Sequence, residues 1–412
     1  MEDRSSSKAP AWMASEFGSF WQTSPTSHEE CAAESALGLL ARGVDRTGAV
    51  QRAESALGNA SCLARPRCLW RGVTVLLCAG ELVGADAQLR RLENTCDDRF
   101  ADMFSLLRAT HARLAGDLAG AQGSLAPLVT MKAAPFIRRV AMPFLLETLA
   151  VAGEVEEADA LLREHEAGQR AAGEQTLRPL MLATRGMVHL AAGRYSEAVE
   201  DLLPCVRLPA ANLAAHPSVM HRRGLAALAA GRGGRSQLAD ALATEEEESA
   251  LIWGAPAHVG WALYVRAIVD GPAGATGPLV DAIELLEVSR TRVGLAEARY
   301  ELGLRLAGAG DDITAKVQLE QAERSARQIG NKNLAARVEA VLGRLAHASA
   351  PRSLTGQEVK IAELARAGYT NRRIAEKLFL TVRTVEFHLS NVYRKLGIAG
   401  RRELMSGTFK LT

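Results

Sequence analysis

A helical unit that recurs about every 37 residues is the feature that most constrains how this chain can fold. Each copy is an apolar stretch that ends in Ala-Gly or a variant of it. One or two polar residues follow, and then a second stretch carries Ala and Leu at helical spacing. The anchor glycines are Gly43, Gly80, Gly116, Gly153, Gly193, Gly231 and Gly310. The final gap of 79 residues leaves room for one degenerate copy around Gly274.

This spacing predicts pairs of antiparallel helices. A glycine just past a helix can adopt the left-handed conformation that satisfies the last carbonyl groups, and a second amphipathic helix then packs back on the first. Each pair has an apolar face that it cannot cover alone, so neighbouring pairs stack into a superhelix. The period and the A-G-x-x-x-x-A kernel resemble tetratricopeptide repeats, although the Trp, Tyr and late Pro positions of that family are mostly unfilled. We therefore expect an all-α body of tetratricopeptide-like helical hairpins over residues 29–345.

The remaining composition favours a cytoplasmic protein without a membrane segment. No apolar run in the sequence approaches the roughly 18 residues that a membrane-spanning helix needs. Residues 1–28 contain no continuous apolar stretch, and we expect them to be a flexible segment rather than a signal peptide. The six cysteines include no C-x-x-C pair, which favours small core residues over a metal site or a disulfide framework.

Charge is distributed unevenly along the chain. Residues 351–412 carry twelve Lys and Arg against five Asp and Glu, a net charge of +7, which leaves −5 for the other 350 residues. A compact basic tail on an acidic body fits a polyanion partner for the tail alone. Residues 346–353 overlap the start of this basic stretch, and their Ala, Ser and Pro content predicts a short flexible linker before the helical part of the tail.

The basic tail, residues 354–412, is expected to form a small helical domain. Thr355 and Glu358 have the spacing of a capping box and begin the first helix. Thr370 is expected to cap a short second helix, and Thr381 a third, with a tight turn between them. A fourth helical segment follows. The third helix turns inward the side chains of Val385, Leu389, Val392 and Leu396.

This tail resembles the LuxR-type helix-turn-helix domain of bacterial transcription regulators. The matching positions extend over about 45 residues. They are Leu354, Thr355, Glu358, Leu364, Gly368, Asn371, Ile374, Ala375, Leu378, Thr384, Val385, His388, Leu389, Lys395, Leu396 and Gly397. The resemblance implies that the domain binds double-stranded DNA with its third helix in the major groove, where base edges can be distinguished.

The resemblance also implies two sets of candidate DNA contacts among the outward-facing positions. The candidate base contacts are Glu386, Phe387, Ser390 and Asn391. A Glu can accept a hydrogen bond from cytosine N4 and a Phe can pack on a thymine methyl group, although Glu386 fits a solvated surface position equally well. The candidate phosphate contacts lie at helix N-termini or flank them. They are Thr370, Asn371, Arg372, Arg383, Thr384, Arg394 and Lys395.

Three positions depart from the family pattern. Arg373 replaces the usual Glu, which disfavours the helix N-terminus by roughly a few tenths of a kcal/mol but adds a candidate phosphate contact. Gly400 replaces the usual Ser or Asn cap of the fourth helix. Gly407 lies in that helix, so the pairing of two copies through it, which the family suggests, stays open.

Repeats followed by this domain resemble the C-terminal part of the large ATP-binding LuxR-type regulators. Their nucleotide-binding module needs a G-x-x-x-x-G-K-[ST] loop, and this sequence contains no Gly-Lys dipeptide. A natural short form and a truncated larger regulator both fit the pattern. The sequence also contains no G-x-S-x-G, H-E-x-x-H or Rossmann glycine motif, so we expect no enzyme activity, no cofactor and no metal site.

The leading interpretation is a sequence-specific transcription regulator whose repeat body binds a protein or small-molecule effector. Repeat superhelices present a long concave surface. Trp253, Trp261 and Tyr264 either line such a groove or, as is more common for aromatic residues, pack in the core. The implied partners are double-stranded DNA, RNA polymerase and a second copy of the chain on DNA. The alternative is a helical-repeat interaction scaffold that binds DNA weakly or without specificity.

Overall fold

The computed structural model describes residues 31–94, 100–130, 133, 135–172, 178–207, 221–272, 274–349, 354 and 356–406. Every regular element in these ranges is a helix, which confirms the predicted all-α class. The chain divides into two compact units, residues 1–342 and 343–412. The flexible segment expected at residues 1–28 lies outside the described residues. In the described ranges, none of the helices combines the length and the apolar character that crossing a bilayer requires.

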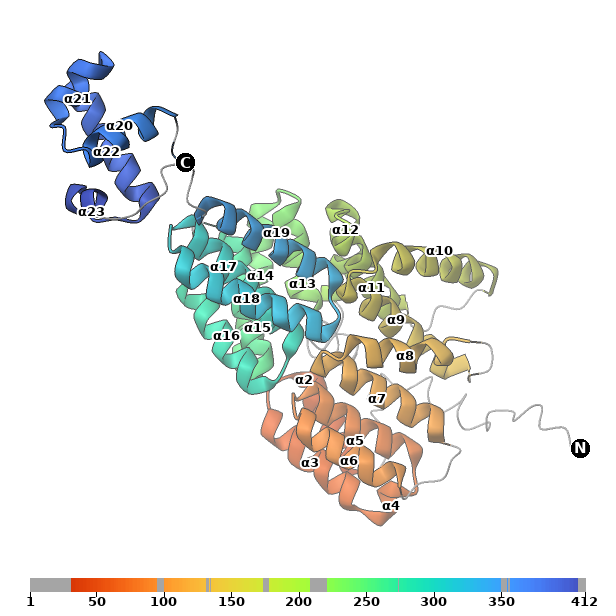
Figure 1. The fold of residues 1–412 in the computed structure, drawn as a ribbon. Coiled ribbons are helices and arrows are strands. Elements are labelled where there is room, and N and C mark those ends of the chain that lie inside the picture. The colour runs from red at the N-terminus through yellow and green to blue at the C-terminus, as the bar shows by residue number, and fades with distance from the viewer. Residues whose placement is uncertain are drawn as a thin grey trace, which may run out of the picture. The chain divides into compact units, whose positions relative to one another are not determined.

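The first unit is a stack of antiparallel helical hairpins, in which each helix pairs with the next one along the chain (Figure 1). The pairs are α2 (Ala32–Arg42) with α3 (Arg46–Gly58), α5 (Pro66–Cys78) with α6 (Leu82–Glu93), α7 (Ala101–Ala115) with α8 (Leu118–Leu128), α9 (Pro135–Ala152) with α10 (Val155–Ala172), α11 (Arg178–Ala191) with α12 (Tyr195–Val206), α13 (Arg222–Arg232) with α14 (Ser236–Trp253), α15 (Pro256–Asp270) with α16 (Gly277–Ser289), and α17 (Arg292–Gly308) with α18 (Asp312–Ile329). The short α4 (Ala60–Leu63) follows α3, and α19 (Lys332–Ser349) follows the last pair. Because α19 continues to Ser349, the first four residues of the expected linker 346–353 are helical.

The turns within the hairpins follow the expected glycine chemistry. At the α7–α8 turn, Gly116 has a φ of +82°, and the amide of Asp117 donates to the carbonyl of Ala112 at 2.8 Å. The Asp117 carboxylate then accepts from the amide of Gly120 at 2.9 Å and so caps α8. One carbonyl at the end of α7 and one amide at the start of α8 are thus satisfied within residues 112–120.

Two of the turn glycines differ from the sequence prediction. The prediction that Gly231 ends a helix was wrong. The helix α13 continues to Arg232, and the left-handed residue is Gly234. The degenerate copy turns at Gly271 rather than at Gly274. With these corrections the positive-φ glycines at the turns within the hairpins stand 36 to 41 residues apart. Their positions are Gly43, Gly80, Gly116, Gly153, Gly193, Gly234, Gly271 and Gly310.

The stack closes on itself through contacts between repeats that are far apart in the sequence. The α9–α10 turn lies against the start of α19, where a Cβ on Gly153 would be 2.7 Å from the Cβ of Asn333. The α7–α8 turn at Gly116 lies nearly as close to the start of α17. Lys332 Nζ is 2.7 Å from Glu154 Oε1, across 178 positions of the chain. The first helices of successive hairpins therefore surround an inner surface.

The second unit has the four helices that the sequence predicts. They are α20 (Gly356–Arg366), α21 (Asn371–Leu378), α22 (Val382–Leu396) and α23 (Arg401–Ser406). Thr370 caps α21 by accepting from the amide of Arg373 at 3.4 Å. Thr381 caps α22 by accepting from the amide of Thr384 at 3.2 Å. Thr355, the first member of the expected capping box, lies outside the described residues. The buried core consists of Ile361, Ala362, Ala365, Ile374, Ala375, Val385, Leu389, Val392 and Leu404.

We expect Gly153→Ala to destabilise the repeat body more than Gly193→Ala does. Both glycines are left-handed, with φ of +83° and +76°, so each substitution costs about 1–2 kcal/mol of backbone strain. A Cβ on Gly193 meets nothing within 4 Å, whereas a Cβ on Gly153 meets α19, which adds about 1–3 kcal/mol of overpacking. Urea denaturation of the two variants measures the difference. Equal losses would show that the two parts of the stack do not touch in solution.

Candidate nucleic-acid interface

The helix α22 has one buried face and one exposed face. Val385, Leu389 and Val392 are almost fully buried in the core, and they fix the rotation of the helix about its axis. The exposed face carries Arg383, Glu386, Phe387 and Ser390. The Phe387 ring is 64% exposed, although burying it would be worth about 1.5–3 kcal/mol. An exposed aromatic side chain at this position is able to pack on an apolar group of a bound molecule.

Three of the four candidate base contacts are presented together on this face. Glu386, Phe387 and Ser390 are exposed, and the Ser390 hydroxyl donates to the carbonyl of Glu386 at 2.9 Å. That bond orients the hydroxyl and leaves its oxygen able to accept from a ligand. Asn391 is only partly exposed, so it lies at the margin of the face.

The N-terminus of α21 brings three candidate phosphate contacts together. Thr370 is exposed and caps the helix, while Arg372 is exposed with its Nε 3.5 Å from Glu376 Oε1. An ion pair this exposed is weak and can be exchanged for a phosphate. Asn371 is partly buried, and its Oδ1 accepts from a guanidinium nitrogen of Arg401 at 2.9 Å.

The N-terminus of α22 is the second exposed helix start. Arg383 is exposed there, and the hydroxyl oxygens of Thr384 and Thr381 are 2.7 Å apart. Free amides and a positive charge at a helix start favour an anion. Arg394, toward the other end of α22, has a side chain outside the described part of the structure.

The remaining phosphate candidate, Lys395, has a partner within the domain. Its Nζ is 2.5 Å from Glu358 Oε2, and the two side chains are only 13% and 6% exposed. This ion pair ties α22 to α20 beneath the exposed face. The structure therefore gives Lys395 a structural contact, and the sequence could not show it because the partners stand 37 positions apart.

Arg401 is a contributor that the sequence reasoning missed. Its guanidinium donates to the carbonyl of Tyr369, to that of Ala365 at 3.4 Å and to Asn371. It therefore joins the start of α23 to the turn before α21 and holds Asn371 in place. No sequence motif marks this role. Phe379, which ends α21 in the turn before α22, is 96% exposed with a φ of +54°.

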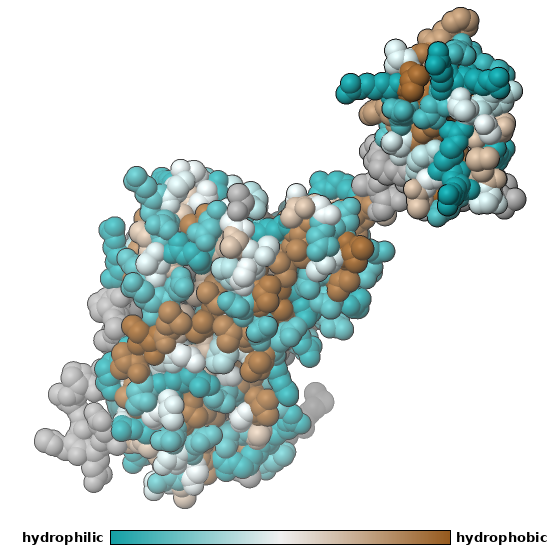
Figure 2. All heavy atoms as spheres, turned by 90° about the vertical axis from the view of Figure 1, so that its left-hand side faces the viewer, coloured by the Kyte–Doolittle hydropathy of each residue, from teal (hydrophilic) through white to brown (hydrophobic). Residues whose placement is uncertain are grey.

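The surface of the second unit is largely polar on the side that Figure 2 shows. In the same view, hydrophobic residues form a band across the repeat body. Residues 352–407 match the family model for bacterial regulatory proteins of the luxR family. The C-terminal domain is a LuxR-type helix-turn-helix.

Curated relatives of the chain match in this LuxR-type domain. The oxygen regulatory protein NreC of Staphylococcus aureus, in strains JH9 and USA300, is 42% identical over 57 residues. The match covers 14% of this chain and 26% of NreC. The chain thus aligns with about a quarter of the length of these relatives, and the likeness carries no information on the repeat body.

A solved structure has a similar fold over most of the chain. It is that of a Rap protein complexed with competence and sporulation factor, with a TM-score of 0.52 at 11% sequence identity. The similarity covers 76% of this chain and 86% of that one. At this identity it shows the fold alone, which is a tetratricopeptide-like arrangement of helices. Both parts of the predicted fold, the helical repeats and the LuxR-type domain, are therefore confirmed.

We expect Lys395→Met to destabilise the LuxR-type domain rather than simply to remove a phosphate contact. Losing one partner of a buried ion pair leaves an uncompensated charge and costs about 3–5 kcal/mol. Replacing both partners, in Glu358→Met/Lys395→Met, should recover most of that loss. Hydrogen exchange of the α20 and α22 amides in the full chain measures the stability of the domain in each variant. Wild-type protection in Lys395→Met, together with weaker DNA binding, would instead identify Lys395 as a phosphate contact.

Proposed function

We propose that this protein is a transcription regulator that binds double-stranded DNA in a sequence-specific manner through the exposed face of α22. The observation that carries the proposal is the geometry of that helix. Its core residues lock its rotation so that Glu386, Phe387 and Ser390 point outward together. A helix presented in this way fits the major groove, and these side-chain types can distinguish base edges.

Backbone contacts would come from the two exposed helix starts beside that face. Thr370 and Arg372 at α21 and Arg383 at α22 are the proposed phosphate contacts, with Asn371, Thr384 and Arg394 alongside them. These contacts orient the protein on the duplex but do not read its sequence. We also propose RNA polymerase and a second copy of the chain as partners. Only the likeness to the LuxR family supports these two. The matched families are regulatory, and we propose no enzymatic activity.

We expect Arg383→Ala and Phe387→Ala to change DNA binding in different ways. Losing Arg383 should weaken binding to all duplexes and reduce the slope of log affinity against log salt by about 1, because one phosphate contact is lost. Losing Phe387 should cost about 1–3 kcal/mol on the preferred sequence and little on a random one. Fluorescence anisotropy titrations at several salt concentrations measure both effects.

The matched control is Lys360→Ala, which removes an exposed positive charge from α20, a helix that contributes neither of the two proposed phosphate-binding helix starts. It should leave the sequence preference intact. Equal losses on specific and random duplexes for all three variants would contradict the division into base and phosphate contacts. If the wild-type chain binds no duplex even at low salt, the interaction scaffold becomes the better account.

We further propose that the repeat body holds the effector in two adjoining cavities on its inner surface. They measure about 160 and 270 Å³, and together they reach the size range of small-ligand sites, about 300–1,000 Å³. Both are lined by the first helices of successive hairpins. The residues that line both cavities are Val151, Met187, Leu225, Trp261 and Val293.

Trp261 is the residue best placed to recognise a ligand there. Its ring centroid lies 5.0 Å from that of His221 and 5.3 Å from that of Tyr264. Its indole N–H is buried and has no hydrogen-bond partner among the described residues. That nitrogen packs against Gly224, where a Cβ would lie 2.6 Å from it, so the indole ring rather than its N–H would contact a ligand. Of the three aromatic residues singled out in the sequence, Trp261 and Tyr264 line a cavity, whereas Trp253 is buried in the core.

Charged groups at the cavity walls further restrict the kind of ligand that would fit. Arg113 and Glu147 form a buried ion pair beside the smaller cavity, where burial raises the pKa of Glu147 and Arg113 opposes that rise. Arg232 lines the larger one. An apolar molecule or short peptide with a hydrogen-bond acceptor suits such a site. The Rap protein of similar fold was solved with competence and sporulation factor, so effector binding by a body of this kind has a precedent.

The test uses protein labelled with 5-fluorotryptophan and a library of short peptides and acyl amides. Compounds that alter DNA affinity should shift the fluorine resonance that disappears in Trp261→Phe, and leave that of Trp70, buried in α5, unchanged. Their affinity should fall in Trp261→Phe because the smaller ring offers less contact area to the ligand. A compound that alters DNA binding with full affinity for Trp261→Phe would place the effector site elsewhere.

A further inference from the structure

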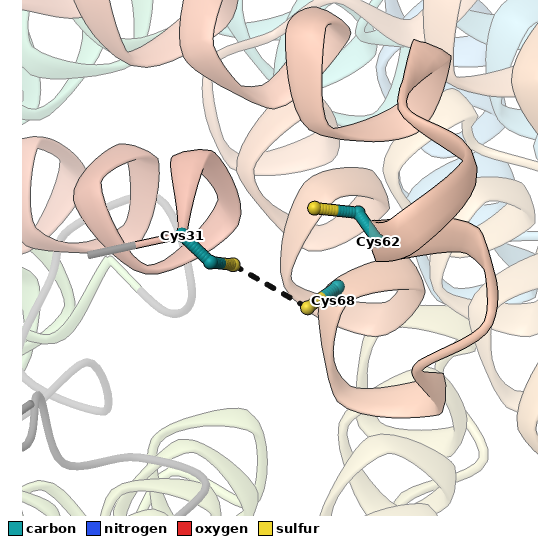
Figure 3. Close-up of side chains that lie close together, drawn as sticks. All are labelled: Cys31, Cys62 and Cys68. Atoms are coloured by element: carbon teal, nitrogen blue, oxygen red, sulfur yellow. Dashed lines mark hydrogen bonds between the residues drawn. The ribbon is translucent and has the colours of Figure 1, made fainter. Parts of the chain in front are cut away.

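Three cysteines from three separate segments converge at the N-terminal end of the repeats (Figure 3). Cys31 is the N-cap of α2, Cys62 lies in α4 and Cys68 lies in α5. Their Sγ atoms all lie within 4.8 Å of one another, and those of Cys31 and Cys68 are 3.4 Å apart. The three sulfurs therefore point into one shared space.

The surroundings leave that space to the sulfurs. Cys62 and Cys68 are buried, and Cys31 is partly exposed. The other members of this small hydrophobic cluster are Ala32, Ala33 and Ala56, none of which carries a group that could ligate a metal ion. Cys31 also stands at the N-terminus of an 11-residue helix, an end that favours negative charge on the sulfur.

The geometry matches a metal ion better than a disulfide. With metal–sulfur bonds of about 2.3 Å, three sulfurs around one ion lie about 4 Å apart in a trigonal arrangement and slightly closer in a tetrahedral one. The observed separations, from 3.4 Å up to at most 4.8 Å, span that value. A disulfide needs about 2.05 Å and would use only two of the three cysteines.

We propose that Cys31, Cys62 and Cys68 form a three-thiolate site for one thiophilic metal ion of the zinc(II) or copper(I) class. Thiolate ligands select these soft ions over magnesium or calcium. Copper(I) would be satisfied by three sulfurs, whereas zinc(II) would take water as a fourth ligand on the exposed side of Cys31. The ion replaces the thiol protons and joins the start of α2 to α4 and α5. It thereby links the first two hairpins of the stack.

The test is a titration of the full chain, kept reduced and freed of metal, with cadmium(II) as a spectroscopic probe. We expect one equivalent to bind, with the ultraviolet absorption of cadmium–thiolate bonds, and to raise the melting temperature. Zinc(II) and copper(I) should each displace it, and the stronger competitor identifies the ion that the site prefers. None of these readouts depends on DNA binding or on the effector.

Variants separate this site from ordinary buried thiols. Cys31→Ala removes a partly exposed ligand with little effect on folding, and should weaken binding by more than about 100-fold, beyond the 10–100-fold that loss of a supporting hydrogen bond causes. Cys62→Ala should do the same. Cys78→Ala and Cys205→Ala, which remove buried thiols elsewhere in the body, should bind as the wild type does. No absorption with the folded, reduced wild type, or undiminished affinity in Cys31→Ala, would overturn the proposal.

Discussion

The contact between the α9–α10 turn and the start of α19 is the constraint on which the rest of the repeat body depends. An array of hairpins contacts only its neighbours unless its curvature brings distant repeats together. Here the glycine at position 153 lets the backbone of one turn approach Asn333 more closely than any side chain would permit. The ion pair between Glu154 and Lys332 lies beside this approach. The inner surface becomes enclosed, and its cavities are lined by helices from six successive hairpins rather than by one open groove.

In the LuxR-type domain, some charged side chains bond to other parts of the domain, while others are exposed to solvent. Lys395 neutralises the buried Glu358, and Arg401 bonds to the turn before α21. Both cations bond within the domain, whereas the side chains of Arg383 and Arg372 are exposed. A basic net charge alone therefore overstates how many cations are exposed and free of partners within the domain. The exposed helix starts and the outward face of α22 define the surface better than the composition does.

Much of this organisation follows from local sequence chemistry. Glycine at helix ends, Asp117 at a helix start and the Thr370 and Thr381 caps act over four residues or fewer, so the order of the hairpins and the four-helix tail could be predicted. The misplaced turn at Gly231 shows the limit, because in a Gly-Arg-Gly-Gly run several residues can end a helix and only packing selects one.

Features that depend on distant partners could not be predicted. The ion pair of Lys395 and the bonds of Arg401 join helices that are 30 or more positions apart. Cys31 and Cys68 stand 37 positions apart, a spacing that resembles no metal motif, yet α2, α4 and α5 bring their thiols together. The enclosed cavities likewise require the closure at Gly153. In each case the fold of the chain brings distant side chains together, and no local sequence pattern shows which side chains will meet.

The most direct measurement for the central claim is selection of bound duplexes from a random library by the full chain at low and at moderate salt. The account predicts enrichment of one short motif, read by the exposed face of α22, and a palindromic motif would further indicate that two copies bind together. Binding should weaken steeply with salt, because a tail that contacts several phosphates releases several counterions. Recovery of unenriched duplexes, or of none at low salt, would contradict sequence-specific reading and leave the repeat body as the functional part of the protein.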